Sequence, residues 1–204
     1  MDAATSLDEE LVQRALDGEI AAMELILYRY HGPVFSYTKR FFVDYTVAEE
    51  AAQDTFIKAF RKLASFGRKG SLEGWLLRIC ERCCIDRRRY EQRQPTTVDL
   101  DDAGDRGLGN HGDAKPTLSL VSARRHRDQQ EQAALRERLE EEINALPLEE
   151  RLPVTLVCIH EFSQQAAAEI LGIPPTTLRD RLIRGRRHLA EKLDDYRRRK
   201  AEHG

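Results

Sequence analysis

The sequence of 204 residues has no long apolar run. Its apolar stretches are far shorter than the roughly 20 residues that a membrane-spanning helix needs, so we expect no insertion into a membrane. The first residues, MDAATSLDEELVQ, are acidic. They lack the basic and then apolar layout of a secretory signal, and we therefore expect a cytoplasmic protein.

Cysteine is scarce, with four residues that are too few and too bunched for the disulfide framework of a secreted protein. Cys80, Cys83 and Cys84 would share one helix, so a redox switch or a zinc site is an alternative to burial in a core. A tetrahedral zinc site needs a fourth ligand, and Cys158 and His160 belong to the other half of the chain. We favour core packing, and we expect no metal and no cofactor.

The chain also lacks the alternation of apolar and polar residues that predicts a strand. Almost every local signal is helical. The capping box Ser6-Leu7-Asp8-Glu9 predicts a helix start, and the apolar spacing predicts further helices. We expect these over residues 20–30, 34–42 and 47–63, and from residue 72 or 75 to residue 89. The sequence therefore predicts an all-α protein.

One stretch in the middle of the chain has no apolar period. It reads QRQPTTVDLDDAGDRGLGNHGDAK and is rich in glycine, aspartate and turn residues, which is typical of a flexible linker. A helical core stripe then returns at Leu135, Leu139, Ile143 and Leu146. We predict two small helical domains, residues 1–93 and 130–204, joined by an acidic flexible linker over residues 94–129.

The stretch SQQAAAEILGIPPTTLRDRLIRGRRHL contains two short amphipathic segments hinged at Gly172. Glycine permits a sharp turn, and two prolines preset the backbone that enters the second segment. This layout predicts a helix-turn-helix. The expected inner face of its second helix comprises Leu178, Leu182, Gly185 and Leu189.

The outward face of that second helix is rich in arginine, although the net charge of the whole chain is only −2. Arginine can bond guanine, isoleucine can contact a thymine methyl, and threonine can hold phosphates near a helix start. The alternative is a helical hairpin with a solvated basic face. Since turn, core spacing and basic face coincide, we favour DNA binding. The expected residues are Thr176, Thr177, Arg179, Asp180, Ile183, Arg184 and Arg187.

Two blocks resemble a known family. LEEEINALPLEERLPVTLVCIHEFSQQAAAEILGIPPTTLRDRLIRGRRHLAEKL looks like region four of an extracytoplasmic-function (ECF, group four) RNA polymerase sigma factor of the sigma-70 family. YRYHGPVFSYTKRFFVDYTVAEEAAQDTFIKAFRKLASF followed by GSLEGWLLRICERCCIDRRR is similar to region two of the same family. The two blocks occur in the family's order and spacing and cover most of the chain.

The resemblance implies a polymerase-binding face on the helix expected over residues 47–63. Its outer stripe of Glu50, Gln53, Asp54 and Ile57 matches the face by which region two docks on the clamp coiled coil of the largest polymerase subunit. Carboxylates suit a basic partner. The alternatives are a solvated helix face and a metal site formed by neighbouring carboxylates, but no histidine lies nearby in the sequence.

The resemblance also implies a −10 site in the loop of residues 66–73 and in the helix after it. The family's loop captures a base flipped from the −10 element, which needs a pocket and backbone contacts. Trp75 is favoured as a core residue. The family often has asparagine where this chain has Arg82, which speaks against base reading there. The expected residues are Arg68, Lys69, Ser71, Arg78, Arg82, Arg87 and Arg88.

We therefore expect a sigma factor that binds core RNA polymerase and promoter DNA and is not itself an enzyme. By family analogy an anti-sigma factor is a further partner, and the acidic linker would thread toward the RNA exit channel or simply be solvated. Asp180 either contacts cytosine or pairs with Arg184. Two other functions are alternatives: a helix-turn-helix regulator independent of polymerase, and a redox- or metal-sensing interaction protein.

Overall fold

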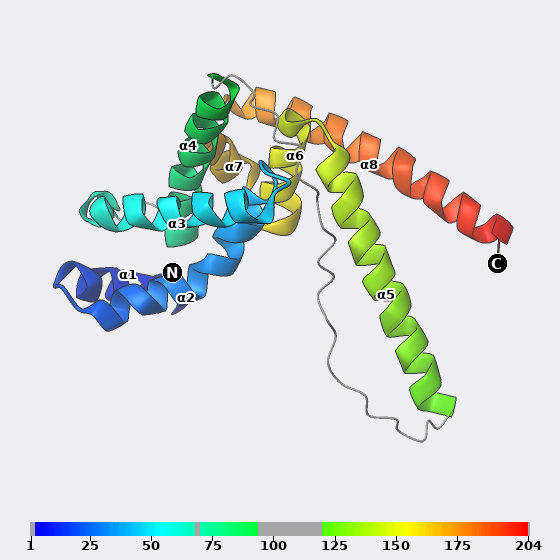
Figure 1. The fold of residues 1–204 in the computed structure, drawn as a ribbon, viewed down its shortest axis with the longest axis horizontal. Coiled ribbons are helices and arrows are strands. Elements are labelled where there is room, and N and C mark those ends of the chain that lie inside the picture. Colours follow the sequence, from blue (N-terminus) through cyan, green and yellow to red (C-terminus); the bar gives the residue numbers. More distant parts are fainter. Residues whose placement is uncertain (1–2, 68–69, 94–119, 204) are drawn as a thin grey trace.

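The computed structural model describes residues 3–67, 70–93 and 120–203. Regular structure in these ranges is helical, and no strand occurs among them (Figure 1). The expectation of an all-α protein is confirmed. No helix in the described ranges is long and apolar enough to span a membrane. Part of the expected linker lies outside these ranges, so its flexibility and the domain boundaries stay a prediction.

Four α-helices and one short 3₁₀ helix form the described part of the N-terminal domain. They are α1 (Ala3–Leu16), α2 (Ile20–Thr38), α3 (Tyr45–Arg61), the 3₁₀ helix (Leu63–Ser65) and α4 (Leu72–Arg93). Each helix turns one apolar stripe toward the others, because burial of that stripe removes apolar surface from water. The shared core includes Ile26, Val34, Tyr37, Phe56, Leu72, Leu76 and Leu77.

The helix α2 runs without a break through Pro33. The expected separation into helices over residues 20–30 and 34–42 is therefore wrong. Proline inside a helix removes one hydrogen-bond donor and crowds the preceding turn. The buried stripe nevertheless continues across it from Tyr30 to Val34, and burial of these side chains outweighs the local cost.

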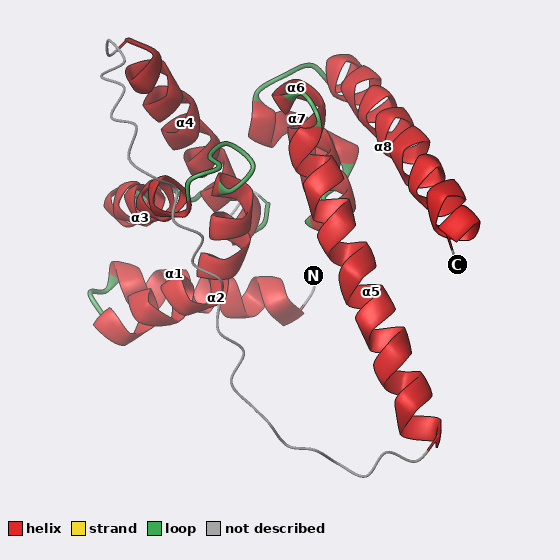
Figure 2. Cartoon of the chain, turned by 45° about the vertical axis from the view of Figure 1, so that its right-hand side comes forward, coloured by secondary structure: helices red, strands yellow, loops and turns green. Residues whose placement is uncertain are grey.

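The C-terminal domain is also helical. It contains α5 (Leu120–Ala145), α6 (Leu148–Val154), a π-helical turn (Thr155–Ile159), α7 (Gln164–Leu171) and α8 (Pro175–His203). The first half of α5 and the second half of α8 project away from the remaining helices (Figure 2). The last turns of α5 pack into the domain, since Ile143 is buried in one apolar cluster with Val154 and Leu182. The compact part of this domain therefore lies around the end of α5, α6, α7 and the first half of α8.

The helices α7 and α8 form the predicted helix-turn-helix. Ser163 caps α7, since its Oγ accepts a hydrogen bond of 3.2 Å from the N–H of Ala166. Gly172 ends α7 with a left-handed φ of 63°, a conformation that glycine adopts without steric cost. Both ends of α7 are therefore fixed by local interactions, and Gly172 at its C-terminal end starts the turn into α8.

The predicted inner face of α8 packs inward. Leu178, Leu182 and Leu189 are buried, and Gly185 lies where α6 crosses α8. A Cβ atom at this glycine would lie 2.8 Å from Cγ2 of Val154 and 3.2 Å from the carbonyl oxygen of Glu150. The missing side chain at residue 185 thus allows the two helices to approach closely.

The two domains pack against each other through α4 and α7. Leu72 and Leu76 of α4 belong to the same continuous apolar core as Ala167 and Ile170 of α7. A polar contact lies beside this core, where Nδ1 of the buried His160 is 3.0 Å from Oε1 of Glu73. The domains therefore share an interface that composition alone does not determine.

Candidate polymerase and nucleic-acid interface

The acidic stripe expected for polymerase binding lies on the outer face of α3. The side chains of Glu50, Gln53 and Asp54 are exposed, as is the apolar side chain of Ile57. Asp44 caps the start of this helix by accepting a hydrogen bond of 3.1 Å from the N–H of Val47. The stripe therefore lies on a helix with a capped N-terminus, and it combines negative charge with one exposed apolar side chain.

The acidic stripe is not isolated from the predicted −10 residues. Arg87, which projects from α4, forms an ion pair with Glu50. Its Nη1 atom also lies 3.9 Å from Oδ2 of Asp54, and its Nε atom lies 3.6 Å from Oε1 of Glu91. An arginine predicted to hold phosphate is thus engaged with carboxylates predicted to bind polymerase.

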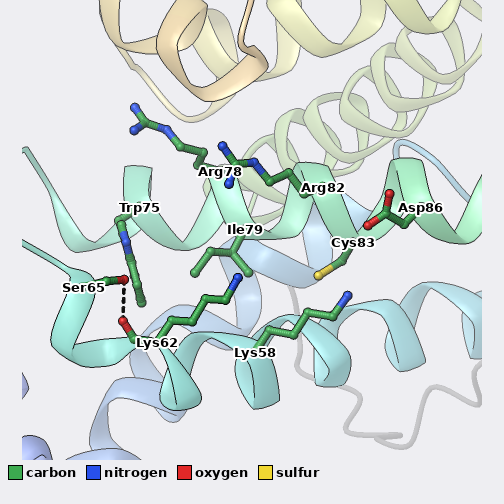
Figure 3. A pocket seen from close by; sticks show the side chains of 9 residues that line it. All are labelled: Lys58, Lys62, Ser65, Trp75, Arg78, Ile79, Arg82, Cys83 and Asp86. Atoms are coloured by element: carbon green, nitrogen blue, oxygen red, sulfur yellow. Dashed lines mark hydrogen bonds between the residues drawn. The ribbon is translucent and has the colours of Figure 1, made fainter.

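A basic cleft of about 410 Å³ lies between α3 and α4 (Figure 3). The ammonium groups of Lys58 and Lys62 point from α3 toward α4, and Arg78 and Arg82 line the α4 side. Asp86 is the carboxylate among the lining residues. The guanidinium groups of Arg78 and Arg82 turn away from the two lysines (Figure 3). Four cationic side chains that line one space with a single carboxylate still favour an anionic ligand.

Lys58 and Lys62, which line this cleft, were not among the site residues predicted from the sequence. The available signal was their spacing of four residues at the end of a helix that directly precedes the predicted −10 loop. Trp75 also lines this cleft, where it is half-buried and meets the ring of Phe66 edge-on at 5.5 Å. Its packing against the core agrees with the favoured interpretation, although part of its ring surface faces the cleft.

The other predicted −10 residues have different surroundings. Arg68 and Lys69 lie outside the described residues. The Oγ of Ser71 accepts a hydrogen bond of 3.1 Å from the N–H of Gly74, so this hydroxyl stabilises the start of α4. Arg88 is half-buried further along the helix.

Arg78 makes a contact across the domain interface. Its Nη2 atom lies 3.4 Å from Oε2 of Glu169 on α7. Phe162 and Ile170 come close to the first turn of α4 in the same place, and Ser71 lines the small cleft between them. The C-terminal domain therefore covers part of the predicted −10 surface.

The outward face of α8 carries the predicted −35 residues. Thr176, Arg179, Asp180, Ile183, Arg184 and Arg187 are exposed, and Thr177 is half-buried. Arg184 lies 3.7 Å from Glu149 and 3.8 Å from Glu150. The helix therefore presents basic, apolar and hydroxyl groups together on its outer side, with Arg184 drawn toward α6.

The cysteine cluster packs in the core of the N-terminal domain. Cys80, Cys83 and Cys84 are buried, which confirms the favoured interpretation, whereas Cys158 is exposed. The Sγ atoms of Cys80 and Cys84 are 3.9 Å apart. Burial raises the pKa of the Cys83 thiol, and the contact with Cys80 together with burial raises the pKa of Cys84. Raised pKa values lower the thiolate fraction and hence the reactivity.

A buried acid lies next to these thiols. The hydroxyl of Tyr37 donates a hydrogen bond of 2.6 Å to Oε2 of Glu81, and both side chains are buried. Burial raises the pKa of Glu81 to about 7, although the hydrogen bond from Tyr37 opposes this shift. The sequence did not single out this pair, because its two residues are separated by more than forty positions.

Comparison with known proteins assigns both domains to one family. The family model for Sigma-70 region 2 matches residues 27–94, and the model for Sigma-70 region 4 matches residues 136–189. Together the two matches span more than half of the chain. They include the acidic stripe, the basic cleft and the helix-turn-helix.

Individual relatives agree with this assignment. The ECF RNA polymerase sigma-E factor of Haemophilus influenzae is 28% identical over 91% of this chain and 95% of its own length. The RNA polymerase sigma-H factor of Pseudomonas aeruginosa is 28% identical over 91% of this chain and 93% of its own. Both relatives are therefore matched over nearly their whole length.

Solved structures show the same fold. CnrH, in complex with the cytosolic domain of CnrY, has a TM-score of 0.60 at 21% identity, over 95% of this chain and 99% of its own. The sigma factor RpoE of Bartonella quintana, in complex with the anti-sigma factor NepR, has a TM-score of 0.59 at 23% identity. The match covers 84% of this chain and 96% of RpoE. The chain thus belongs to the sigma-70 family and is an ECF-type RNA polymerase sigma factor, which directs transcription initiation.

Proposed function

We propose that this sigma factor binds core RNA polymerase through the acidic stripe of α3 and recognises promoter DNA with two separate surfaces. The observation that carries the proposal is the segregation of charge on the N-terminal domain. The outer face of α3 is acidic, whereas the adjoining cleft between α3 and α4 is basic. One helix can therefore face a basic protein on one side and nucleic acid on the other.

The acidic stripe suits a basic, partly apolar protein surface. Glu50, Asp54 and Gln53 supply hydrogen-bond acceptors, and Ile57 supplies an apolar contact. Complementary charge raises the rate and the specificity of association. The family resemblance points to the clamp coiled coil of the largest polymerase subunit as the partner surface.

The basic cleft suits a single strand of the −10 element. Proteins that hold single strands combine cations along the backbone with aromatic or apolar surfaces for the bases. Lys58, Lys62 and Arg82 supply the cations, and the ring of Trp75 lines the same space. We assign Lys58 and Lys62 to the −10 surface in addition to the residues predicted from sequence.

The exposed face of α8 suits the major groove at the −35 element. A recognition helix contacts base edges with residues near its N-terminus, and Arg179 and Ile183 are exposed in the first turns of α8. Asp180 lies beside them and can accept a hydrogen bond from cytosine. We therefore expect Asp180 to favour a G·C base pair over an A·T base pair at the position that it contacts.

Binding of both elements at once requires the two domains to separate. The −35 and −10 positions are roughly 25 base pairs apart, which is about 85 Å of B-form DNA. The helix α7 lies directly against α4, so the two DNA-binding surfaces belong to one compact body. We infer that polymerase and promoter bind a more extended arrangement.

We also propose a cytoplasmic location and an anti-sigma partner. Core polymerase and promoter DNA lie in the cytoplasm of a bacterium, and RpoE of Bartonella quintana was solved with an anti-sigma factor. A protein inhibitor of this class would stabilise the compact arrangement of this chain. The chain forms no covalent bond itself, because RNA synthesis is the work of the polymerase.

A transcription assay tests the proposal. Purified bacterial core polymerase is given a promoter library with and without the chain, and the transcription start sites are mapped. We expect new starts that share upstream elements near −10 and −35. If the chain binds DNA but yields no new starts with a cognate core enzyme, the regulator that acts without polymerase becomes the better account.

A charge reversal distinguishes more directly between a sigma factor and a DNA-binding regulator that acts without polymerase. Asp54→Lys should weaken core binding by tenfold or more, since one reversed charge in such an interface costs more than about 1.4 kcal/mol. Glu24→Lys is the matched control, because Glu24 is an exposed carboxylate of α2. Equal core affinity of the two variants, measured by fluorescence competition, would contradict the proposed polymerase face.

A further inference from the structure

Arg87 stands between the two charged surfaces of the N-terminal domain. It belongs to α4, the helix that lines the basic cleft, but its guanidinium reaches the acidic stripe of α3. It pairs with Glu50, and its Nη1 atom lies 3.9 Å from Asp54. One cation is therefore in contact with two carboxylates of the proposed polymerase face.

Other arginines of α4 point elsewhere. Arg82 lines the basic cleft, and Arg78 contacts Glu169 of the C-terminal domain. The Arg87 side chain is only 25% exposed, whereas those of Glu50 and Asp54 are 53% and 58% exposed. The carboxylates are therefore open to an incoming partner while the arginine lies behind them.

A basic partner and Arg87 favour the same carboxylates. A cation that approaches Glu50 and Asp54 is attracted by them and repelled by the guanidinium already held there. Departure of Arg87 from the stripe removes this repulsion. After losing Glu50 and Asp54, Arg87 still has Glu91 of its own helix 3.6 Å from its Nε atom. Its remaining N–H groups are then free to bind the phosphates of DNA along the same helix.

We propose that Arg87 couples polymerase binding to −10 DNA binding. In the chain alone it offsets part of the negative charge of the acidic stripe, and on the polymerase it moves to a DNA phosphate. This inference rests on the proposed function and adds a positioning residue to it. Because linkage is reciprocal, DNA that takes up Arg87 also strengthens binding of the chain to polymerase.

The coupling has a modest expected size. Exposed ion pairs are worth about 0–1 kcal/mol, and a coupling of that size changes an affinity by roughly two- to fivefold. The coupling is therefore recognised by the opposite signs of its effects on core affinity and on DNA affinity, and not by their size. A variant without the guanidinium should bind core polymerase more tightly and promoter DNA more weakly.

The test uses Arg87→Met in the full chain, with Arg82→Met as the matched control. Core affinity is measured by fluorescence competition, and the assembled complex is then titrated with a −10 single-stranded oligonucleotide at low salt. We expect Arg87→Met to raise core affinity by about two- to fivefold and to lower DNA affinity. Arg82→Met should lower DNA affinity and leave core affinity unchanged.

A double-mutant cycle on the chain alone provides the second readout. Glu50→Gln should strengthen binding of the oligonucleotide in the absence of polymerase, because it removes the nearest of the carboxylates that hold Arg87. That gain should disappear when Arg87→Met is already present. Glu49→Gln on the same helix, whose carboxylate contacts His31, should show the same small change in both backgrounds.

Two results would overturn the inference. One is a decrease or no change in core affinity for Arg87→Met while the wild-type chain binds core normally, which would make Arg87 a structural or simple DNA-contact residue. The other is a gain from Glu50→Gln that survives the loss of Arg87. If the wild-type chain does not bind core polymerase at all, the proposed function fails together with the coupling.

Discussion

The guanidinium of Arg40 donates a hydrogen bond of 2.7 Å to Oδ1 of Asn144, which lies 104 residues further along the chain. Arg40 follows α2 and is only 2% exposed, and its guanidinium also pairs with Glu140 of α5 at 2.7 Å. The Nη1 atom of Arg151 donates to the carbonyl oxygen of Arg40 at 2.8 Å. One arginine thus ties the N-terminal domain to two helices of the C-terminal domain.

Replacement of this arginine should loosen the compact arrangement. We expect Arg40→Met to lower the free energy of unfolding by about 1–3 kcal/mol, because it removes charge-assisted hydrogen bonds from a buried position. Small-angle scattering should show a larger radius of gyration. Lys39→Met is the control, since Lys39 is an exposed neighbour. An unchanged radius together with normal stability would show that Arg40 does not hold the domains together.

The contact between α6 and α8 predicts a second effect on stability. Gly185→Ala should destabilise the C-terminal domain by about 1–3 kcal/mol, because a new Cβ would clash with Val154 and press on the backbone of Glu150. Denaturant unfolding measures this loss. Gly32→Ala is the matched control, since apart from its chain neighbours and the backbone of α2 no atom lies within 4 Å of its Cβ position. The better helix propensity of alanine is opposed by the restriction that Pro33 places on residue 32, so stability should change by less than about 1 kcal/mol.

The buried Glu81 predicts a pH dependence with a definite sign. Burial raises its pKa from the ordinary 4.5 to about 7, so folding favours the protonated acid. This contribution to stability is complete below pH 4.5 and is lost as the pH rises through 7. Because one pKa unit corresponds to about 1.36 kcal/mol, the loss amounts to at most about 3 kcal/mol.

Glu81→Gln should remove this pH-dependent contribution to the free energy of unfolding. The amide oxygen can still accept the hydrogen bond from Tyr37, but the side chain no longer ionises. Unfolding free energies of both proteins are measured from pH 5 to pH 8, and their difference cancels the titration of other groups. The wild-type chain should lose stability relative to the variant as the pH rises. A constant difference over this range would show that Glu81 keeps an ordinary pKa.

The cysteines should divide into two classes of reactivity. Cys158 is exposed, whereas the other three cysteines are buried and two of them have raised thiol pKa values. In the native chain at neutral pH, a thiol reagent should modify one residue rapidly and three residues only after unfolding. Cys158→Ser should remove the fast phase. Rapid labelling of Cys83 in the native chain would instead revive the redox-sensing alternative.

Local patterns were sufficient to predict a large part of this protein. Helix caps, helical periodicity and turn residues depend on neighbours within a few positions. The helix-turn-helix around Gly172 and the inward packing of Leu178 and Leu182 were therefore predicted correctly, as was burial of Cys80. Two local predictions were wrong. The helix α1 begins at Ala3 and not at the capping box of Ser6, and a buried stripe overrode the break expected near Pro33.

The sequence by itself determined the all-α class, the inner and outer faces of α8 and the similarity to a sigma-factor family. Only the tertiary structure decided that Lys58 and Lys62 share a cleft with Arg82, that Arg87 turns to the acidic stripe, and that Arg40 is buried between the domains. Periodicity shows which face of a helix is buried, but hydrophobic burial is non-directional and does not specify which helix covers that face. Ion pairs and shared clefts depend on that choice, since electrostatic interactions follow distance in space rather than separation along the chain.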